Sequence, residues 1–254
     1  MAGEGLKRSC AVVMAGGRGE RYWPLSTGAV SKPFLPLLGQ KSMIQQTIER
    51  IKPLIPPSRI LVVLGREHVG VAREQLAEIA PENFLIEPVG KDTAPCIGFA
   101  SLHLEKRAPD ALMVVLPADH YIQDQKNFLD SLSAAIRLLE FREEIIALGI
   151  RPTRPETSYG YIEAGEEIDS IAGVPFLKVG RFVEKPDLES AKRYIADENY
   201  YWNSGIFIWR NSTIQALLKR CLPDVWRGLA RIRVNVDDNK VVTEVFGAVT
   251  EGFH

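Results

Sequence analysis

The chain has 254 residues, 46% of them hydrophobic and 25% charged, so it can bury a sizeable core without a disulfide or a structural metal. Its 31 basic and 32 acidic residues nearly cancel, which argues against nucleic acid or an anionic membrane as its main partner. Three widely spaced cysteines, Cys10, Cys96 and Cys221, form no CxxC pair, and the apolar run at residues 10–15 is too short to target or anchor a protein. We therefore expect a cytoplasmic protein of one or two globular domains.

Short apolar runs alternate with helix-like segments through the first 150 residues. Runs rich in Val, Ile and Leu predict buried strands at residues 11–14, 60–64, 84–86, 112–116 and 145–148. Apolar residues at three- and four-residue spacing predict helices at residues 42–51, 69–79, 96–107 and 128–141. This alternation predicts an α/β fold with a mainly parallel central sheet and helices on both faces.

The character of the sequence changes after Gly149, where Gly, Pro and Tyr become frequent. Extended pieces are expected at residues 159–163, 176–184 and 204–209, interleaved with two shorter helices. There is no internal repeat and no long linker, so we predict one domain over residues 1–254. Its two lobes are residues 1–150 and 151–254, and the second lobe is expected to cover a ligand.

Three glycines and two arginines follow the first expected strand, in the order Ala15, Gly16, Gly17, Arg18, Gly19, Glu20 and Arg21. Glycines allow close approach of the backbone to a phosphate at the carboxyl end of a parallel strand, and the arginines add positive charge. Neither common phosphate-loop pattern is complete, because Tyr22 stands where a third glycine is needed and no Gly-Lys-Ser/Thr triplet follows. Taken alone, the segment could also be a tight turn with solvated arginines.

The segment Ser31-Lys32-Pro33-Phe34-Leu35-Pro36-Leu37 follows at short range, and with the glycine segment it resembles the signature of sugar-nucleotide pyrophosphorylases. Further matches, in the expected order, are similar to mannose-1-phosphate guanylyltransferases over residues 10 to about 210. These matches are Glu87-Pro88, Lys91-Asp92-Thr93-Ala94-Pro95, Leu116-Pro117-Ala118-Asp119-His120, Arg154-Pro155-Glu156-Thr157, Tyr159-Gly160-Tyr161-Ile162, Phe182-Val183-Glu184-Lys185-Pro186 and Trp202-Asn203-Ser204-Gly205-Ile206-Phe207.

The resemblance implies a Rossmann-like nucleotidyltransferase fold with a nucleotide-binding half and a sugar-binding lobe. It implies GTP and mannose 1-phosphate as substrates, Mg²⁺ as cofactor, and GDP-mannose and pyrophosphate as products. A homodimer is one expected assembly, although the sequence leaves the oligomeric state open.

The chemistry of this transfer requires charge neutralisation and positioning rather than a protein nucleophile. We expect Arg18 and Lys32 to neutralise the triphosphate as catalytic residues, with Arg21 assisting. Asp119 follows the expected strand 112–116, where its carboxylate is expected to bind magnesium. The alternatives are a solvated loop lysine at position 32 and a capping or turn aspartate at position 119.

Two further groups of residues are expected to contact substrate. The nucleotide-binding group is Ala15, Gly16, Gly17, Gly19, Arg21, Glu87, Asp92 and Thr93. Within it, the stretch from Glu87 to Thr93 is expected to select the base through a carboxylate and backbone groups. The sugar-phosphate group is Tyr159, Gly160, Glu184, Lys185 and Asn203, which combines aromatic, hydroxyl-binding and cationic side chains. Asp92 and Thr93 are alternatively only a helix cap, and the aromatic residues alternatively only core.

The sequence departs from the family pattern at two places. Ser158 stands where glycine is usual, which predicts a backbone conformation that serine adopts less readily. The chain also stops at His254, before the family's second metal-binding aspartate, so we expect the family's C-terminal portion to be absent. Two other functions stay open: a sugar-1-phosphate nucleotidyltransferase for another base or sugar, and a catalytically silent nucleotide-sugar-binding regulator. Of the four histidines, only His120 is a candidate for testing.

Overall fold

The computed structural model describes residues 4–16, 31–88, 93–233, 236 and 238–249. In these residues one eight-stranded sheet runs in the order β3-β2-β1-β4-β8-β6-β7, and β5 pairs with β8 beside this path. The strands are β1 (Ser9–Met14), β2 (Ile60–Gly65), β3 (Phe84–Glu87), β4 (Leu112–Pro117), β5 (Ile146–Ile150), β6 (Tyr161–Ile171), β7 (Val174–Val183) and β8 (Tyr200–Arg210).

The strands β1 to β4 are parallel to one another, as expected from their apolar sequences. Val12, Val62 and Val114 are completely buried, because helices cover both faces of the sheet. The register pairs Met14 with Pro117 and Gly65 with Glu87, so the ends of these strands lie along one edge. The α/β fold with a mainly parallel core is therefore confirmed.

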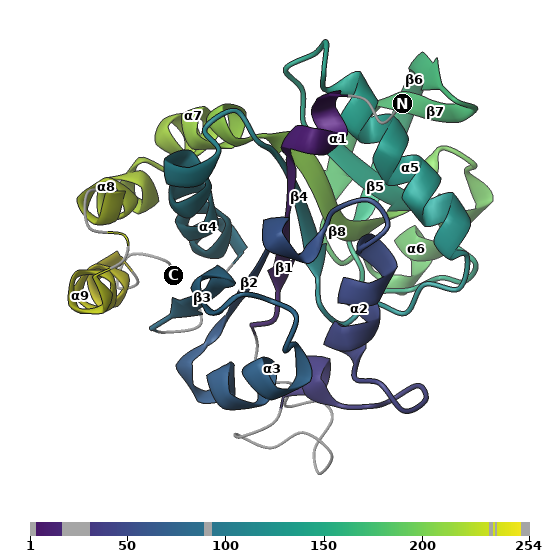
Figure 1. Ribbon diagram of the computed structural model, residues 1–254. Helices are drawn as coiled ribbons and strands as arrows, with labels where there is room; N and C mark the ends of the chain where they lie inside the picture. The colour runs from purple at the N-terminus through teal and green to yellow at the C-terminus, as the bar shows by residue number, and fades with distance from the viewer. Residues whose placement is uncertain (1–3, 17–30, 89–92, 234–235, 237, 250–254) are drawn as a thin grey trace.

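Helices pack on both faces of this sheet, as predicted (Figure 1). One face carries α2 (Met43–Ile51), α3 (Val69–Gln75) and α5 (Gln125–Leu138). The other carries α4 (Thr93–Arg107), α7 (Asn211–Cys221), α8 (Pro223–Ile232) and α9 (Asn239–Val249). The remaining helices are α1 (Glu4–Arg8), α6 (Leu188–Ala196) and the short 3₁₀ turns η2 (Lys32–Phe34), η3 (Pro57–Arg59), η4 (Arg66–His68) and η5 (Pro81–Asn83).

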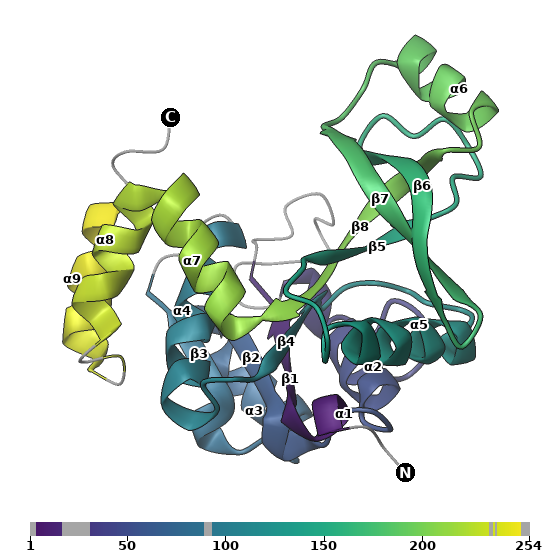
Figure 2. The same ribbon diagram turned by 90° about the horizontal axis from the view of Figure 1, so that it is seen from above.

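The second half of the chain contains more helix than expected. In the described residues after position 150 there are four helices, α6 to α9, so the expectation of two was wrong. The hairpin β6–β7 and α6 lie on one side of the molecule, and α7 to α9 lie on the other (Figure 2). The strand β8 connects them and pairs antiparallel with β4, so part of the second half completes the central sheet. The division into two functional halves stays a prediction.

Two expectations from the sequence concern membrane-spanning helices and disulfides. Within the described residues, no helix has both the length and the apolar character needed to cross a bilayer. All three cysteines are free, with Cys10 and Cys96 buried and Cys221 exposed.

Candidate functional site

The carboxyl ends of the parallel strands bring three distant segments together. The Ala118 N–H donates to the Met14 carbonyl at 3.0 Å, and the Ala15 N–H donates to the Val63 carbonyl at 2.8 Å. The ladder therefore continues one residue beyond β1 and β4, and Asp119 lies at this edge of the sheet. Open α/β sheets bind ligands here, because the chain leaves the strands in loops that can surround a ligand.

Lys32 and Asp119 meet at this edge, although 87 positions separate them in the sequence. Lys32 Nζ lies 2.7 Å from Asp119 Oδ2, with the two side chains 22% and 32% exposed. The turn η2 begins at Lys32, and the next two residues, Pro33 and Phe34, are buried, which holds Lys32 at the edge. The two side chains therefore present, side by side, a cation that can bind phosphate oxygens and a carboxylate that can bind a metal ion.

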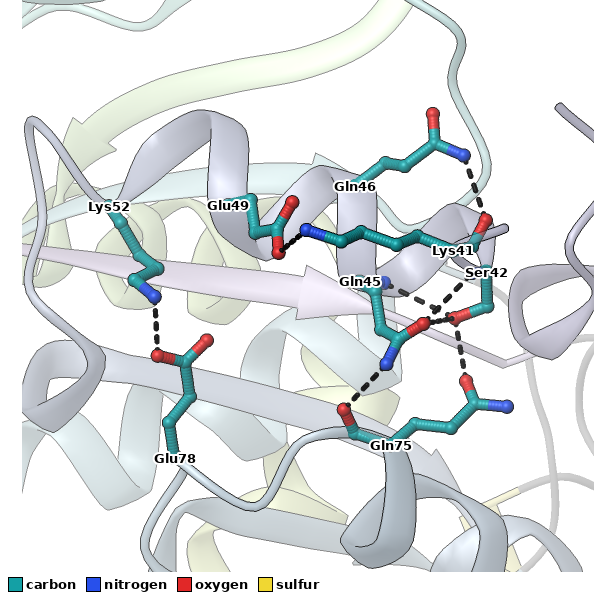
Figure 3. A network of polar contacts seen from close by, with 8 residues as sticks. All are labelled: Lys41, Ser42, Gln45, Gln46, Glu49, Lys52, Gln75 and Glu78. Atoms are coloured by element: carbon teal, nitrogen blue, oxygen red, sulfur yellow. Dashed lines mark hydrogen bonds and ion pairs between the residues drawn. The ribbon is translucent and has the colours of Figure 1, made fainter. Parts of the chain in front are cut away.

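A polar network of Ser42, Gln45 and Gln75 joins α2 to α3 (Figure 3), and Gln75 also contacts the segment that carries Lys32. Gln75 Nε2 donates to the Phe34 carbonyl at 3.1 Å, and Ser42 Oγ donates to Gln75 Oε1 at 2.6 Å. Gln45 Nε2 donates to the Gln75 carbonyl at 3.0 Å, and Ser42 and Gln45 form the capping box of α2. These contacts connect η2, α2 and α3 and so restrain the backbone at Lys32.

Glu87 ends β3 as a buried carboxyl group that is only 2% exposed. Its Oε1 has no hydrogen-bond partner in the described part of the chain, and burial raises the pKa of Glu87 to about 7. A Cβ placed on Gly16 would lie 3.6 Å from Glu87 Oε2, so the end of β1 passes beside this carboxyl group. Because a buried acceptor without a partner is costly, this group suits a ligand that supplies N–H donors.

The predicted sugar-phosphate residues are adjacent in space. The Asn203 N–H donates to the Gly160 carbonyl at 2.8 Å. A Cβ placed on Gly160 would lie 3.2 Å from Glu184 Oε2, so a larger residue here would require the Glu184 side chain to shift. Lys185 Nζ lies 3.2 Å from Glu184 Oε1, and Lys185 has a φ of 36°, a strained conformation of the kind found at functional sites.

Aromatic side chains lie beside this group. The rings of Tyr159 and Trp202 meet edge to face, with centroids 5.4 Å apart, and the Arg154 guanidinium lies 5.4 Å from the Trp202 ring centroid. Ser158 does not have a positive φ, so the expectation of an unfavourable backbone there was wrong. Its hydroxyl instead donates to Glu156 Oε1 at 2.7 Å and stabilises the loop.

Several expected site residues lie outside the described part of the chain. These are Gly17, Arg18, Gly19, Arg21 and Asp92. Of their neighbours, Ala15 is buried at the end of β1, and Thr93 is the first residue of α4. His120 follows Asp119, and its pKa is lowered mainly by burial.

Two side chains of α2 contact the Asp119 segment without having been predicted to do so. Thr47 Oγ1 donates to the Ala118 carbonyl at 3.3 Å, and Arg50 Nη2 donates to the His120 carbonyl at 3.3 Å. Both residues are buried. In the sequence, Thr47 and Arg50 are visible only as polar residues next to the apolar positions of a predicted helix. That pattern does not show which groups they contact.

Comparisons with known proteins give a consistent result. A family model described as nucleotidyl transferase matches residues 10–228. A mannose-1-phosphate guanylyltransferase of Klebsiella pneumoniae is 40% identical over 230 residues, which cover 90% of this chain and 48% of that protein. The xanthan biosynthesis protein XanB of Xanthomonas campestris pv. campestris (strain B100) is 42% identical over 216 residues, which cover 84% and 44%. The chain thus spans about half the length of the curated relatives it matches.

A solved structure also resembles this fold over nearly the whole chain. It is described as a mannose-1-phosphate geranyltransferase from Thermus thermophilus. It superimposes with a TM-score of 0.85 at 37% sequence identity, covering 95% of this chain and 68% of the other. The similarity therefore includes the central sheet and most of the second half of the chain.

Proposed function

Because this chain belongs to the nucleotidyl transferase family, we propose that it transfers GMP from GTP to mannose 1-phosphate, giving GDP-mannose and pyrophosphate. The observation that carries the proposal is the Lys32–Asp119 pair at the carboxyl edge of the parallel sheet. The names of relatives about 40% identical to this chain support the choice of substrates. In the reaction, a phosphate oxygen of mannose 1-phosphate bonds to the α-phosphorus of GTP. The bond from that phosphorus to the bridging oxygen breaks, and pyrophosphate leaves.

In this proposal Lys32 neutralises charge on the triphosphate and on the departing pyrophosphate. Its Nζ already lies at the end of β4, and η2 and the network behind it restrain the backbone. A preorganised cation acts without reorganising during the reaction, so it stabilises the transition state more than a mobile one. Arg18 and Arg21, named by the sequence, would add positive charge from the glycine segment.

The proposed cofactor is Mg²⁺, with Asp119 as its protein ligand. Among the described residues, no cluster of three His, Cys, Asp or Glu side chains could hold a metal alone. Asp119 fits a different arrangement, because Mg²⁺ is commonly held by one or two carboxylates together with substrate phosphates. When bound, the ion would supply charge neutralisation to the phosphates. Asp119 would then bind the ion together with the nucleotide phosphates, and in this way it would orient the nucleotide.

Glu87 is proposed to recognise the guanine base. Guanine presents two neighbouring donors, the N1–H and the exocyclic amino group, and a carboxylate presents two acceptors at matching spacing. The Oε1 atom of Glu87 lacks a partner among the described residues, so such a base would satisfy a buried group. Glu87 must be ionised to accept both hydrogen bonds, which couples base binding to pH.

We expect GTP binding to tighten as pH rises towards neutrality. The pKa of Glu87 is raised to about 7, so below this pH binding has to release a proton, and affinity falls roughly tenfold per pH unit. Calorimetry with GTP between pH 5.5 and 8.5 measures this slope. Glu87→Gln is expected to weaken binding by roughly one to two orders of magnitude and to remove the slope.

Protein stability provides a control for this prediction. The folded-state pKa of Glu87, about 7, exceeds its ordinary value of 4.5, so the folded protein holds a proton that the unfolded chain releases. The contribution of Glu87 to the free energy of unfolding is fully present below pH 4.5. It is lost as the pH rises to about 7, and the loss amounts to about 3 kcal/mol. Glu87→Gln should flatten that dependence. Equal GTP affinity at pH 6 and pH 8 in the wild-type protein would contradict the assignment of Glu87 to the base.

The sugar-phosphate residues Tyr159, Gly160, Glu184, Lys185 and Asn203 are proposed to bind mannose 1-phosphate. Gly160→Ala tests this group, because its added Cβ would lie 3.2 Å from Glu184 Oε2 and force that side chain to move. We expect the KM for mannose 1-phosphate to rise roughly tenfold with little change in the KM for GTP. Gly70→Ala is the matched control, since nothing lies within 4 Å of its Cβ. An unchanged KM for mannose 1-phosphate would remove Gly160 from the site.

The function is tested by incubating the chain with GTP, mannose 1-phosphate and Mg²⁺ and separating the products by ion-exchange chromatography. A panel with UTP, dTTP and glucose 1-phosphate runs in parallel. Preferential formation of GDP-mannose with equimolar pyrophosphate supports the proposal. A different preferred nucleotide sugar would overturn the choice of base or sugar. Tight GDP-mannose binding without turnover would favour the regulatory alternative.

A further inference from the structure

Two side chains of α2 hold the backbone on both sides of Asp119. Thr47 Oγ1 bonds to the carbonyl of residue 118, and Arg50 Nη2 bonds to the carbonyl of residue 120, each at 3.3 Å. The two residues are three positions apart and therefore lie on one face of the helix. Because the held carbonyls flank Asp119, these contacts restrict the position and direction of its side chain.

Burial of the Thr47 hydroxyl and the Arg50 guanidinium carries a desolvation cost that opposes folding. Thr47 is 1% exposed and Arg50 is 4% exposed. Arg50 Nε has no hydrogen-bond partner in the described residues, and burial lowers the pKa of the guanidinium. No carboxylate in the described parts of the chain forms an ion pair with Arg50. An apolar side chain of similar volume would avoid this desolvation cost, so stability alone does not account for a guanidinium here.

The helix that presents them is itself firmly held. Ile44, Ile48 and Ile51 of α2 are completely buried in the core beneath the sheet. The capping box at Ser42 and its bond to Gln75 fix the start of the helix. The helix thus supports both members of the ion pair. Lys32 is held through Gln75, which bonds to Ser42 and to the Phe34 carbonyl, and Asp119 is held through Thr47 and Arg50.

We propose that Thr47 and Arg50 are positioning residues that set the Asp119 carboxylate for the metal–nucleotide complex. This inference rests on the proposed function, because it takes Asp119 as the metal ligand. Neither side chain is assigned a contact with substrate. A carboxylate displaced by a fraction of an ångström loses metal affinity, since Mg²⁺ demands nearly ideal ligand geometry.

The experiment measures Mn²⁺ binding in the presence of GTP by electron paramagnetic resonance, which needs no turnover. The variants are Thr47→Val, Thr47→Ser, Arg50→Met and, as reference, Asp119→Asn. We expect Thr47→Val and Arg50→Met each to weaken Mn²⁺ binding roughly five- to tenfold, and Thr47→Ser to restore it. The KM for mannose 1-phosphate should stay within twofold of wild type.

Arg50→Met separates positioning from charge and from stability. Removing a cation near a metal site would tighten Mn²⁺ binding by Coulomb's law, so a weakening reports a displaced carboxylate. The unfolding temperature should stay unchanged or rise, because a buried guanidinium has been removed. Ser101→Ala is the matched control for Thr47→Val, since Ser101 is a fully buried hydroxyl that donates to the Gly98 carbonyl on the opposite face of the sheet.

Wild-type Mn²⁺ affinity in folded Thr47→Val and Arg50→Met, with a weakened Asp119→Asn, would overturn this inference. Unchanged affinity in Asp119→Asn would overturn it as well, because no ligand would remain to be positioned. Failure of the proposed function is seen separately, as the absence of GDP-mannose from a wild-type protein that still binds Mn²⁺ with GTP. If Thr47→Val does not fold, Arg50→Met decides the matter.

Discussion

Replacement of Lys32 by methionine should lower the rate of GDP-mannose formation by roughly two to three orders of magnitude. Methionine keeps the length of the side chain but removes the charge that is proposed to stabilise the triphosphate and the leaving group. Folding should survive, because a partly exposed ion pair contributes little to stability. The measurement is steady-state kcat with pyrophosphate release as the readout, together with the unfolding temperature.

Lys41→Met is the matched control for this prediction. Lys41 also pairs with a carboxylate, Glu49, but its side chain is 56% exposed on the surface beside α2. We expect wild-type kcat in Lys41→Met. Wild-type kcat in Lys32→Met would show that the Lys32–Asp119 pair is only structural, and the proposed function would lose the observation that carries it.

Asp119→Asn should lower kcat by roughly two orders of magnitude or more and raise the Mg²⁺ concentration needed for half-maximal rate at least about tenfold. Asparagine keeps the shape of the side chain and removes the charge that a hard cation prefers. Metal binding without nucleotide should be weak even in the wild-type protein, since the described residues provide no cluster of three ligands. A Mn²⁺ titration with and without GTP measures both effects.

Asp130→Asn provides the control for Asp119→Asn. Asp130 is an exposed carboxylate on α5 that pairs with Lys126, and its loss should leave metal dependence unchanged. If Asp119→Asn requires no more Mg²⁺ than the wild-type protein, Asp119 is not the metal ligand. The double variant Lys32→Met with Asp119→Asn should lose less activity than the two single losses combined, because the side chains are in contact.

Most strands of the parallel core could be predicted from the local pattern of apolar residues. The apolar runs that became β1 to β4 were identified within two residues of their ends, because buried parallel strands require continuous Val, Ile and Leu. The helix predicted at residues 69–79 ends earlier, at Gln75, and the helices α7 to α9 were undercounted. The helix α8 carried a readable signal, since Val225, Leu229 and Ile232 recur at three- and four-residue spacing and are buried.

The sequence alone identified the family, the parallel core and the position of Asp119 directly after a buried strand, because strand periodicity and motif order are local properties of the chain. Only the tertiary structure placed Lys32 against Asp119, buried Glu87 beside Gly16, and brought Thr47 and Arg50 under the Asp119 segment. Each of these contacts joins residues about 70 or more positions apart. Such neighbours are decided by the order of strands in the sheet and by the helix face that packs against it, neither of which a local pattern specifies.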